Sequence, residues 1–426
     1  MSVDCCCRLR TRLFTLWVIG LSVLTPALVR ANVVDDWNAI AQQAIVVNAG
    51  RGGAVAVVDY AYVQVAVYDA VNAIDGRYSV FAVRPLSSPV GGSPEAAAAT
   101  AAYLTLKWMF PAQQAYLDGV YASYMAGIPA GSPRTIGVIV GTEVANAFTA
   151  SRAGDGRNAS VGYVFGSGPG VYQLTPGCPA PPASPASPWL GQLKPFAIES
   201  PAQFRADGPP DLTSAQWADD LNETRLYGAL NASLRTSEET RTGQFYAENP
   251  GSQFGRNVRG IATAYQLSVA DSARFFAQVF VTTADSLITV FNSKYYYSFW
   301  RPLTAIRAAD TDDNPNTDTD PAWLPLISTP CHPEYPAAHG AGTGGLAHAL
   351  EQFFSTKRVE FTLTSTSVPG FATYSHHFTK TQDLVKEVID ARIFGGMHYR
   401  TSGVHGTVIG DKVAHYVAKH FFQPVE

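Results

Sequence analysis

Cationic and imidazole side chains recur in three short segments of the last third of the chain. Lys294 and Arg301 lie in KYYYSFWRP, His339 ends PAAH, and Arg392 and His398 lie in RIFGGMH. A guanidinium binds an oxyanion through two parallel hydrogen bonds, and an ammonium adds a compact positive charge. Three cations with two imidazoles therefore predict a site for a tetrahedral oxyanion of the size of phosphate.

Local elements must aim these side chains at one place. Lys294 and Arg301 are seven residues apart, about two helical turns, so we expect both on one face of a single helix that ends at Pro302. His339 stands at the start of an apolar helical stretch, residues 341–354, whose free N-terminal amides favour an anion beside them.

Two glycines, Gly395 and Gly396, separate Arg392 from His398. Glycine allows tight backbone turns, and successive amides in such a turn can form a concave anion site. We therefore expect this turn to direct backbone amides at the same oxyanion and to bring His398 to face His339.

The order K-x6-RP, P-x-x-H and R-x5-H resembles the three-part signature of the vanadium haloperoxidase and type 2 phosphatidic acid phosphatase superfamily. The segments FWRPLTAIR, HPEYPAAHG and ARIFGGMHYR resemble the versions found in soluble vanadium-dependent haloperoxidases, and this motif core spans residues 294–414. VYDAVNAIDGRY, residues 67–78, also resembles the opening helices of those proteins.

The resemblance implies a vanadate cofactor, with hydrogen peroxide and a halide as substrates and hypohalous acid as product. Lys294, Arg301 and Arg392 would neutralise the equatorial oxygens of vanadate. His398 would be the vanadium ligand and His339 the acid–base group. In the phosphatase alternative, a phosphate ester occupies the same pocket and His398 forms a phosphohistidine, as in a soluble acid phosphatase.

The chain departs from the family pattern in the second and third motifs. Ala337 and Ala338 replace the usual hydroxyl donor and glycine, so one hydrogen bond to the oxyanion, worth about 1–3 kcal/mol, is absent. Ala391 stands where Ser is frequent, and Ser402 replaces the Asp that phosphatases place behind the histidine. Phosphatase activity is therefore the second interpretation, and an inactive anion-binding relative is the third.

His332 lies seven residues before His339. In the family, this position tends to be Phe in proteins that oxidise chloride and His in proteins that oxidise bromide. The resemblance therefore predicts a halide-tuning role for His332 and bromide or iodide as the substrate. In the alternative interpretation, His332 only opens the proline-rich turn HPEYP.

Residues 1–31 have the pattern of a secretory signal peptide. Three arginines precede the uncharged run 13–24, and Val29, Arg30 and Ala31 form a small-residue cleavage pattern. We expect a secreted or periplasmic protein, with an uncleaved N-terminal anchor as the alternative. Past this segment the sequence contains no uncharged and predominantly apolar stretch of about 18 residues, so we expect no membrane-spanning segment.

Charge and cysteine usage fit an exported enzyme. The chain has 30 basic and 34 acidic side chains, a formal net charge of −4, and this acidic balance excludes nucleic acid as an expected partner.

Three of its 5 cysteines fall in residues 5–7. The other two, Cys178 and Cys331, predict a disulfide in an oxidising compartment, with two free thiols as the alternative.

Apolar residues recur at helical spacing along most of the chain, so we expect an all-α protein with a single large helical-bundle domain of the vanadium haloperoxidase type over residues 32–426. A short hairpin is expected where Val359, Phe361 and Leu363 alternate with polar residues. Residues 154–210, rich in Gly, Pro and Ser, predict a long irregular excursion over the pocket entrance. The sequence does not predict an oligomeric state. The expected helices cover residues 55–74, 94–127, 134–152, 214–230, 270–299, 341–354, 380–393 and 404–421.

Overall fold

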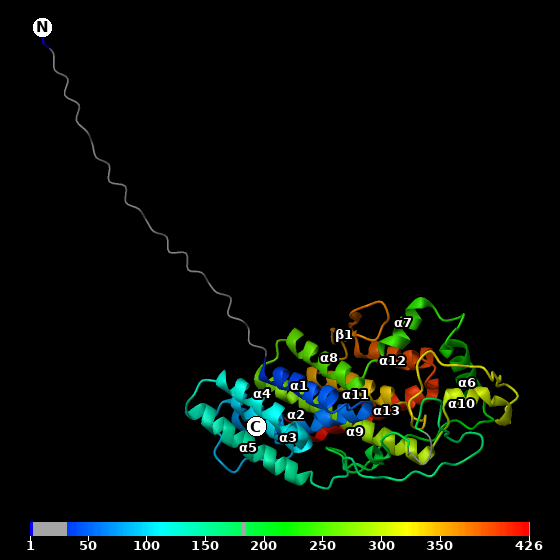
Figure 1. Cartoon of the computed structure of the whole chain (residues 1–426), viewed down its shortest axis with the longest axis horizontal. Coiled ribbons are helices and arrows are strands. Elements are labelled where there is room, and N and C mark those ends of the chain that lie inside the picture. Colours follow the sequence, from blue (N-terminus) through cyan, green and yellow to red (C-terminus); the bar gives the residue numbers. More distant parts are fainter. Residues whose placement is uncertain (3–31, 180–184, 426) are drawn as a thin grey trace. The chain divides into compact units, whose positions relative to one another are not determined.

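Helices form nearly all the regular structure of the computed structural model, which describes residues 1–2, 32–179 and 185–425 (Figure 1). The expected signal peptide lies almost wholly outside these residues and stays a prediction. The helices are α1 (Val33–Gln42), α2 (Gly53–Asp75), α3 (Pro94–Met109), α4 (Gln114–Ala126), α5 (Ser132–Ser151), α6 (Ala215–Gly228), α7 (Ser237–Phe245), α8 (Pro250–Ala264), α9 (Val269–Tyr297), α10 (Pro302–Arg307), α11 (Ala338–Phe354), α12 (Thr381–Phe394) and α13 (Arg400–His420).

The strands form one antiparallel hairpin, β1 (Phe361–Ser365) and β2 (Tyr374–Phe378), in which Phe361 pairs with Phe378. The all-α prediction and the hairpin are therefore confirmed. In the described parts of 154–210, residues 154–179 and 185–210, there is little regular structure beyond a short 3-10 helix at Pro188–Gln192, as the glycine and proline content predicts.

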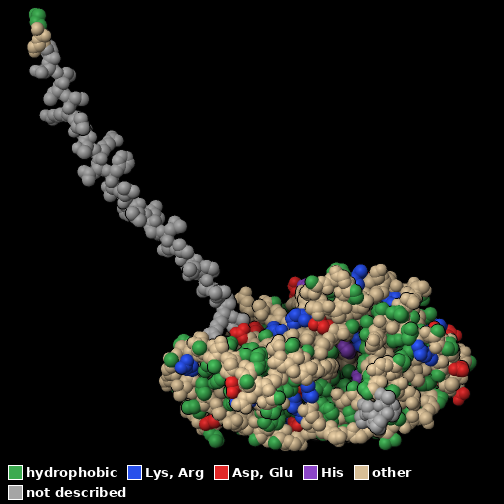
Figure 2. Space-filling model, viewed as in Figure 1, with side chains coloured by type: hydrophobic (Ala, Val, Ile, Leu, Met, Phe, Trp, Pro, Cys, Tyr) green, Lys and Arg blue, Asp and Glu red, His purple; other side chains and the backbone are tan. Residues whose placement is uncertain are grey.

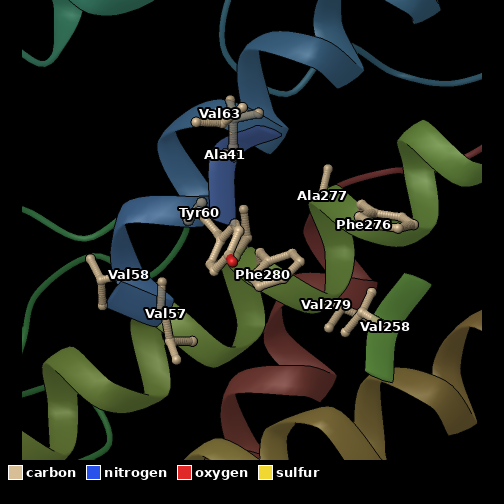
Figure 3. Close-up of a cluster of buried hydrophobic side chains, with 14 of the residues drawn as sticks. Ala41, Val57, Val58, Tyr60, Val63, Val258, Phe276, Ala277, Val279 and Phe280 are labelled. Atoms are coloured by element: carbon tan, nitrogen blue, oxygen red, sulfur yellow. The ribbon is translucent and has the colours of Figure 1, made fainter. Parts of the chain in front are cut away.

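The core is built around α9, which packs against α2, α11 and α13. Figure 3 shows part of this contact, where the rings of Tyr60 on α2 and Phe280 on α9 lie 4.8 Å apart between centroids. A helix that is apolar on all sides is stable only when it is surrounded.

By length and composition, α2 and α9 could each cross a membrane, but 94% of the apolar window of each is buried inside the fold. The absence of a spanning segment stays a prediction.

Helices α11 and α13 approach each other closely through glycines. A Cβ on Gly410 would lie 2.4 Å from the amide nitrogen of Gly345, and a Cβ on Gly406 would lie 2.5 Å from the carbonyl oxygen of Ala337. Real Cβ atoms do not come that close to backbone atoms. This contact sets the distance between His339, near the start of α11, and the segment that leads into α13.

Lys294 and Arg301 do not share one helix, so that prediction is wrong. Helix α9 ends at Tyr297 because Ser298 adopts the left-handed conformation, with φ 49°, and its amide donates to the carbonyl of Lys294 at 2.9 Å. The next residues pair with a distant loop, since the Trp300 amide donates to the carbonyl of Gly170 at 3.0 Å. Arg301 then becomes the N-cap residue of α10.

The two cysteines outside residues 5–7 form a disulfide. Cys178 and Cys331 are bridged, with their Cα atoms 5.5 Å apart and a sequence separation of 153. Cys331 precedes His332, so the bridge ties the irregular excursion to the second motif. The predicted pairing is confirmed.

The close packing of α11 and α13 makes a testable prediction. Gly410→Ala forces a methyl group onto the backbone of α11 and should lower the free energy of unfolding by about 1–3 kcal/mol. Gly260→Ala is the matched control, because among the described residues no heavy atom lies within 4 Å of the added Cβ. That exposed helical position should gain about 0.5–1 kcal/mol. Urea denaturation measures both, and equal stability of Gly410→Ala and the native protein would contradict the packing.

Candidate active site

The three predicted cations converge from different elements. Lys294 lies in the last turn of α9, Arg301 caps α10, and Arg392 lies near the end of α12. Each is at most 1% exposed. The Lys294 ammonium donates to the carbonyl oxygens of Pro333 at 3.0 Å and Glu334 at 2.6 Å. These bonds attach the first motif to the backbone of the second.

The two guanidiniums are held mainly by backbone carbonyls. Arg301 donates from Nε to the carbonyl of His332 at 2.8 Å and from Nη1 to that of Met397 at 3.0 Å. Arg392 donates from Nη1 to the carbonyl of Tyr246 at 3.1 Å, and its Nη2 lies 2.7 Å from Met397 Sδ. Their donors are therefore oriented by the fold before any anion arrives.

Positive charge in this cluster is only partly offset within the described residues, by the nearby carboxylate of Glu334, which opposes the lowering of the pKa of Lys294 and Arg301. There, Lys294, Arg301 and Arg392 make no salt bridge with a carboxylate, and Arg392 Nε is buried without a hydrogen-bond partner. Burial, and then the charge of Arg301, lower the pKa of Lys294 well below its ordinary value, and the same two causes lower that of Arg392. Buried unpaired cations are costly, so the cluster requires an anion.

His398 presents an unprotonated nitrogen to these cations. Its Nδ1 lies 2.6 Å from Glu334 Oε1, and its Nε2 lies 3.4 Å from Arg301 Nη1. A guanidinium can only donate, so Nε2 carries the lone pair and Nδ1 donates its proton to the carboxylate. Burial, and then Arg301, hold the pKa of His398 well below its ordinary range. The Nε2 lone pair is thus available to a metal or a phosphorus atom.

Glu334 is the functional residue that sequence reasoning missed. Its side chain is completely buried, and burial raises its pKa to about 7 although Lys294 and Arg301 oppose the shift. We expected no carboxylate behind His398, because Ser402 occupies the Asp position, and that expectation is wrong. The signal was present: Glu334 is the only acidic residue in HPEYPAAH.

His339 lies in the first turn of α11, because this helix begins at Ala338, three residues earlier than predicted. Burial, and then Arg392, hold the pKa of its imidazole well below the ordinary value, so it is neutral near pH 7. Within the described chain, the N-cap residue Ala337 contributes no side-chain hydrogen bond to this helix end. The first amides of α11 therefore remain available to an anion.

The glycine turn does not act as expected. The amide of Gly395 donates to the carbonyl of Ala391 at 3.0 Å, and that of Gly396 donates to Ile393 at 2.8 Å. Both donors are used to end α12, so they cannot also bind an oxyanion. Gly396 still has a structural reason to be glycine, since its φ is 70°.

His332 lies beside the cation cluster. Its Nδ1 is 2.9 Å from Arg301 Nη2, and its ring centroid is 5.2 Å from that of Phe291. Nδ1 also lies 3.1 Å from the carbonyl oxygen of Pro333, which can only accept, whereas the guanidinium can only donate. The shorter contact, to Arg301, assigns the lone pair to Nδ1 and the proton of the neutral ring to Nε2. Its halide-tuning role stays a prediction.

A cavity of about 590 Å³ opens onto these groups, and His332, His339, Arg392 and His398 line it. Figure 2 shows histidine side chains at the bottom of a hollow on one face of the molecule. The site therefore combines a cationic cluster, an unprotonated imidazole nitrogen and a neutral second imidazole in one cavity. Such a donor set fits a tetrahedral oxyanion such as vanadate or phosphate.

Comparison with known proteins relates the last third of the chain to a described family. Residues 274–426 match the family model described as the VCPO second helical-bundle domain. The vanadium chloroperoxidase of Curvularia inaequalis is 29% identical over 204 residues, which are 40% of this chain and 32% of that protein. The match thus spans about a third of the length of that relative.

Solved structures extend the likeness to nearly the whole chain. A bacterial vanadium-dependent iodoperoxidase superposes with a TM-score of 0.76 at 22% identity, covering 92% of this chain and 98% of that one. A holo-type bacterial vanadium-dependent chloroperoxidase superposes with a TM-score of 0.67 at 17% identity, covering 86% and 91%. The helical architecture of the chain is thus similar to that of vanadium-dependent haloperoxidases, and its residues 274–426 match the second helical-bundle domain of that family.

Proposed function

We propose that the protein is a vanadate-dependent haloperoxidase, which uses hydrogen peroxide to oxidise a halide to hypohalous acid. The observation that carries this proposal is the cluster of buried cations without a carboxylate partner around the Nε2 lone pair of His398. Lys294, Arg301 and Arg392 would hold the oxygens of vanadate, and His398 Nε2 would be its protein ligand. When bound, vanadate supplies Lewis-acid activation of peroxide.

The surrounding side chains serve proton transfer and orientation. A neutral His339 can accept a proton from entering peroxide and return it to a leaving hydroxide, which general acid–base catalysis requires. Glu334 holds the Nδ1 proton of His398 and so keeps Nε2 unprotonated. The reaction consumes one halide, one hydrogen peroxide and one proton, and it yields one hypohalous acid and one water.

We propose bromide or iodide as the halide on the basis of His332. This residue lines the cavity, accepts from Arg301 through Nδ1 and keeps a donor at Nε2 for a halide. We also propose that the protein is exported, since a Cys178–Cys331 disulfide persists in an oxidising compartment.

A soluble phosphatase is the second candidate, and the Glu334–His398 pair specifically favours it. A carboxylate behind an imidazole raises its nucleophilicity, which a phosphohistidine intermediate requires. A phosphate ester would occupy the same cation cluster, and His339 would protonate the leaving alcohol. The two activities respond oppositely to orthovanadate, which activates the peroxidase and inhibits the phosphatase.

Purified protein with orthovanadate, hydrogen peroxide and bromide should brominate phenol red. His398→Ala removes the proposed vanadium ligand and should lower this rate by more than about 100-fold. Loss of a residue that only hydrogen-bonds to a metal ligand already costs about 10–100-fold. His415→Ala is the matched control, since that imidazole is 59% exposed and does not line the cavity. Hydrolysis of p-nitrophenyl phosphate is measured in parallel.

Phosphate release that orthovanadate inhibits, without bromination, would replace the haloperoxidase proposal by the phosphatase. Failure of both reactions would favour the anion-binding relative without turnover.

Glu334→Gln tests the carboxylate behind His398. An amide oxygen can still accept the Nδ1 proton but no longer raises the basicity of Nε2, so kcat for bromination should fall by about 10–100-fold. Phosphate affinity should not weaken, because a negative charge near the anion is removed. Glu360→Gln is the control, since Glu360 faces His377 at 3.5 Å in an exposed pair. An unchanged kcat in Glu334→Gln would rule out this role.

A further inference from the structure

Met397 lies between two of the three cations of the site. Its sulfur is 2.7 Å from Nη2 of Arg392, and its carbonyl oxygen accepts from Nη1 of Arg301 at 3.0 Å. Its amide donates to the carbonyl of Arg392 at 3.1 Å. The backbone of Met397 is therefore held on both sides, and its side chain has a fixed place beside Arg392, one residue before His398.

Arg392 has no other side-chain partner in the described part of the chain. Its other acceptor is the backbone carbonyl of Tyr246 at 3.1 Å, and its Nε is buried without a hydrogen-bond partner. A thioether sulfur is a weak acceptor, so it competes little with an oxyanion for this guanidinium. The hydrogen bonds that Arg392 can offer to an anion therefore depend on the chemical state of the Met397 sulfur.

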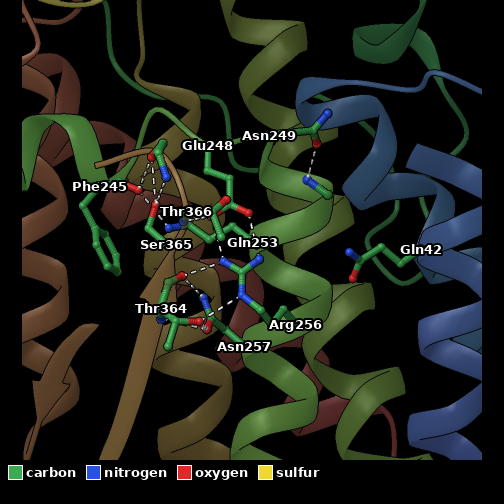
Figure 4. A network of polar contacts seen from close by, with 12 residues as sticks. Gln42, Phe245, Glu248, Asn249, Gln253, Arg256, Asn257, Thr364, Ser365 and Thr366 are labelled. Atoms are coloured by element: carbon green, nitrogen blue, oxygen red, sulfur yellow. Dashed lines mark hydrogen bonds and ion pairs between the residues drawn. The ribbon is translucent and has the colours of Figure 1, made fainter. Parts of the chain in front are cut away.

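No carboxylate on the described cavity wall is free to neutralise Arg392 instead. Of the described residues that line the cavity, only Glu248 is acidic. Figure 4 shows its carboxylate against Arg256, with Glu248 Oε2 2.7 Å from Arg256 Nη2, and the amide of Thr366 donates to the same oxygen at 2.9 Å. Because this carboxylate is already paired, a new acceptor beside Arg392 would meet an uncompensated guanidinium.

The sulfur of Met397 is buried, but it can be reached from the cavity. All 4 methionines of the chain lie within the described residues, and Met397 is the only one that lines the cavity, beside His339 and His398. Its side chain is flexible and apolar, with a polarisable sulfur. An oxidant that forms at the oxyanion site would therefore meet this thioether before it reached the solvent.

Hypohalous acid converts a thioether to a sulfoxide. The sulfur gives two electrons to the halogen, the halogen–oxygen bond breaks and a sulfur–oxygen bond forms, while one halide ion and one proton leave. Methionine sulfoxide is polar, whereas methionine is apolar, and this change can act as a switch. At Met397 the new oxygen would lie beside the guanidinium of Arg392 and accept a charge-assisted hydrogen bond from it.

We propose that Met397 is an oxidation site through which the protein limits its own turnover. The proposal rests on the haloperoxidase function, because that reaction supplies the hypohalous acid. The sulfoxide oxygen takes a donor of Arg392 away from the oxyanion and places partial negative charge beside it. Vanadate or phosphate then binds more weakly, so accumulated product lowers the fraction of protein that is loaded with the anion.

Peptide mass spectrometry measures the sulfoxide at Met397 in two reactions. In one, reagent hypobromous acid is added to vanadate-free protein. In the other, the protein turns over orthovanadate, hydrogen peroxide and bromide, with excess free methionine to consume oxidant that escapes into solution. Met109 is the internal control, because it is 6% exposed, close to the 4% of Met397, and does not line the cavity.

Calorimetric titration with inorganic phosphate compares the vanadate-free protein before and after the reagent. The native protein is tested beside Met397→Leu, which removes the sulfur at similar volume, and the matched control Met109→Leu. Each variant is compared with its own untreated form. A change in packing caused by the substitution therefore does not affect the comparison.

We expect Met397 to be oxidised before Met109 in both reactions. Treatment should weaken phosphate binding about tenfold or more in the native protein and in Met109→Leu, because a hydrogen bond to a charged group contributes about that factor. Met397→Leu should keep its phosphate affinity.

Equal oxidation of the two methionines overturns the proposal, as does an unchanged phosphate affinity after oxidation or the same loss of affinity in Met397→Leu. A protein that brominates phenol red but forms no sulfoxide at Met397 also overturns it. Preferential oxidation by the reagent, with weaker phosphate binding, in a protein that does not brominate supports the modification site and overturns only the proposed function.

Discussion

Burial of positive charge without an acidic partner is the constraint on which the rest of this structure depends. Transfer of an ion from water to a protein interior costs several kcal/mol even after relaxation. Around Lys294, Arg301 and Arg392, backbone carbonyls replace part of the lost hydration. The nearby carboxylate of Glu334 is hydrogen-bonded to His398. The remaining demand for negative charge has to be met by a bound anion.

The scaffold keeps these cations together against their mutual repulsion. Glycines let α11 and α13 approach within distances that a Cβ would forbid, and this contact fixes the second motif against the third. The Cys178–Cys331 bridge and the backbone pairing of Gly170 with Trp300 fix the excursion against the first and second motifs. Rigid elements on all sides preorganise the donors, which is the main source of electrostatic catalysis.

Local patterns in the sequence predict those parts of the site that depend on short spacings. The three motifs, the all-α fold, the hairpin and the cysteine pair could all be read from residue types and periodicity. The break after Tyr297 could not, because it depends on hydrogen bonds from residues 170–172, over a hundred positions away. The role of Glu334 depends on its contact with His398, which is 64 residues away in sequence. Neither segment by itself predicts that the two side chains meet. The glycine turn was misjudged because its amides are needed to end α12.

The most direct test of the unpaired cation cluster is calorimetric titration of the protein with inorganic phosphate between pH 7 and pH 9, in buffers of different ionisation enthalpy. Burial and neighbouring cations lower the pKa of Lys294, and a bound anion opposes that shift. The protein should therefore take up protons as it binds one phosphate, and the affinity should fall as the pH rises and Lys294 loses its proton. Binding without proton uptake, or no binding at all, would contradict the account.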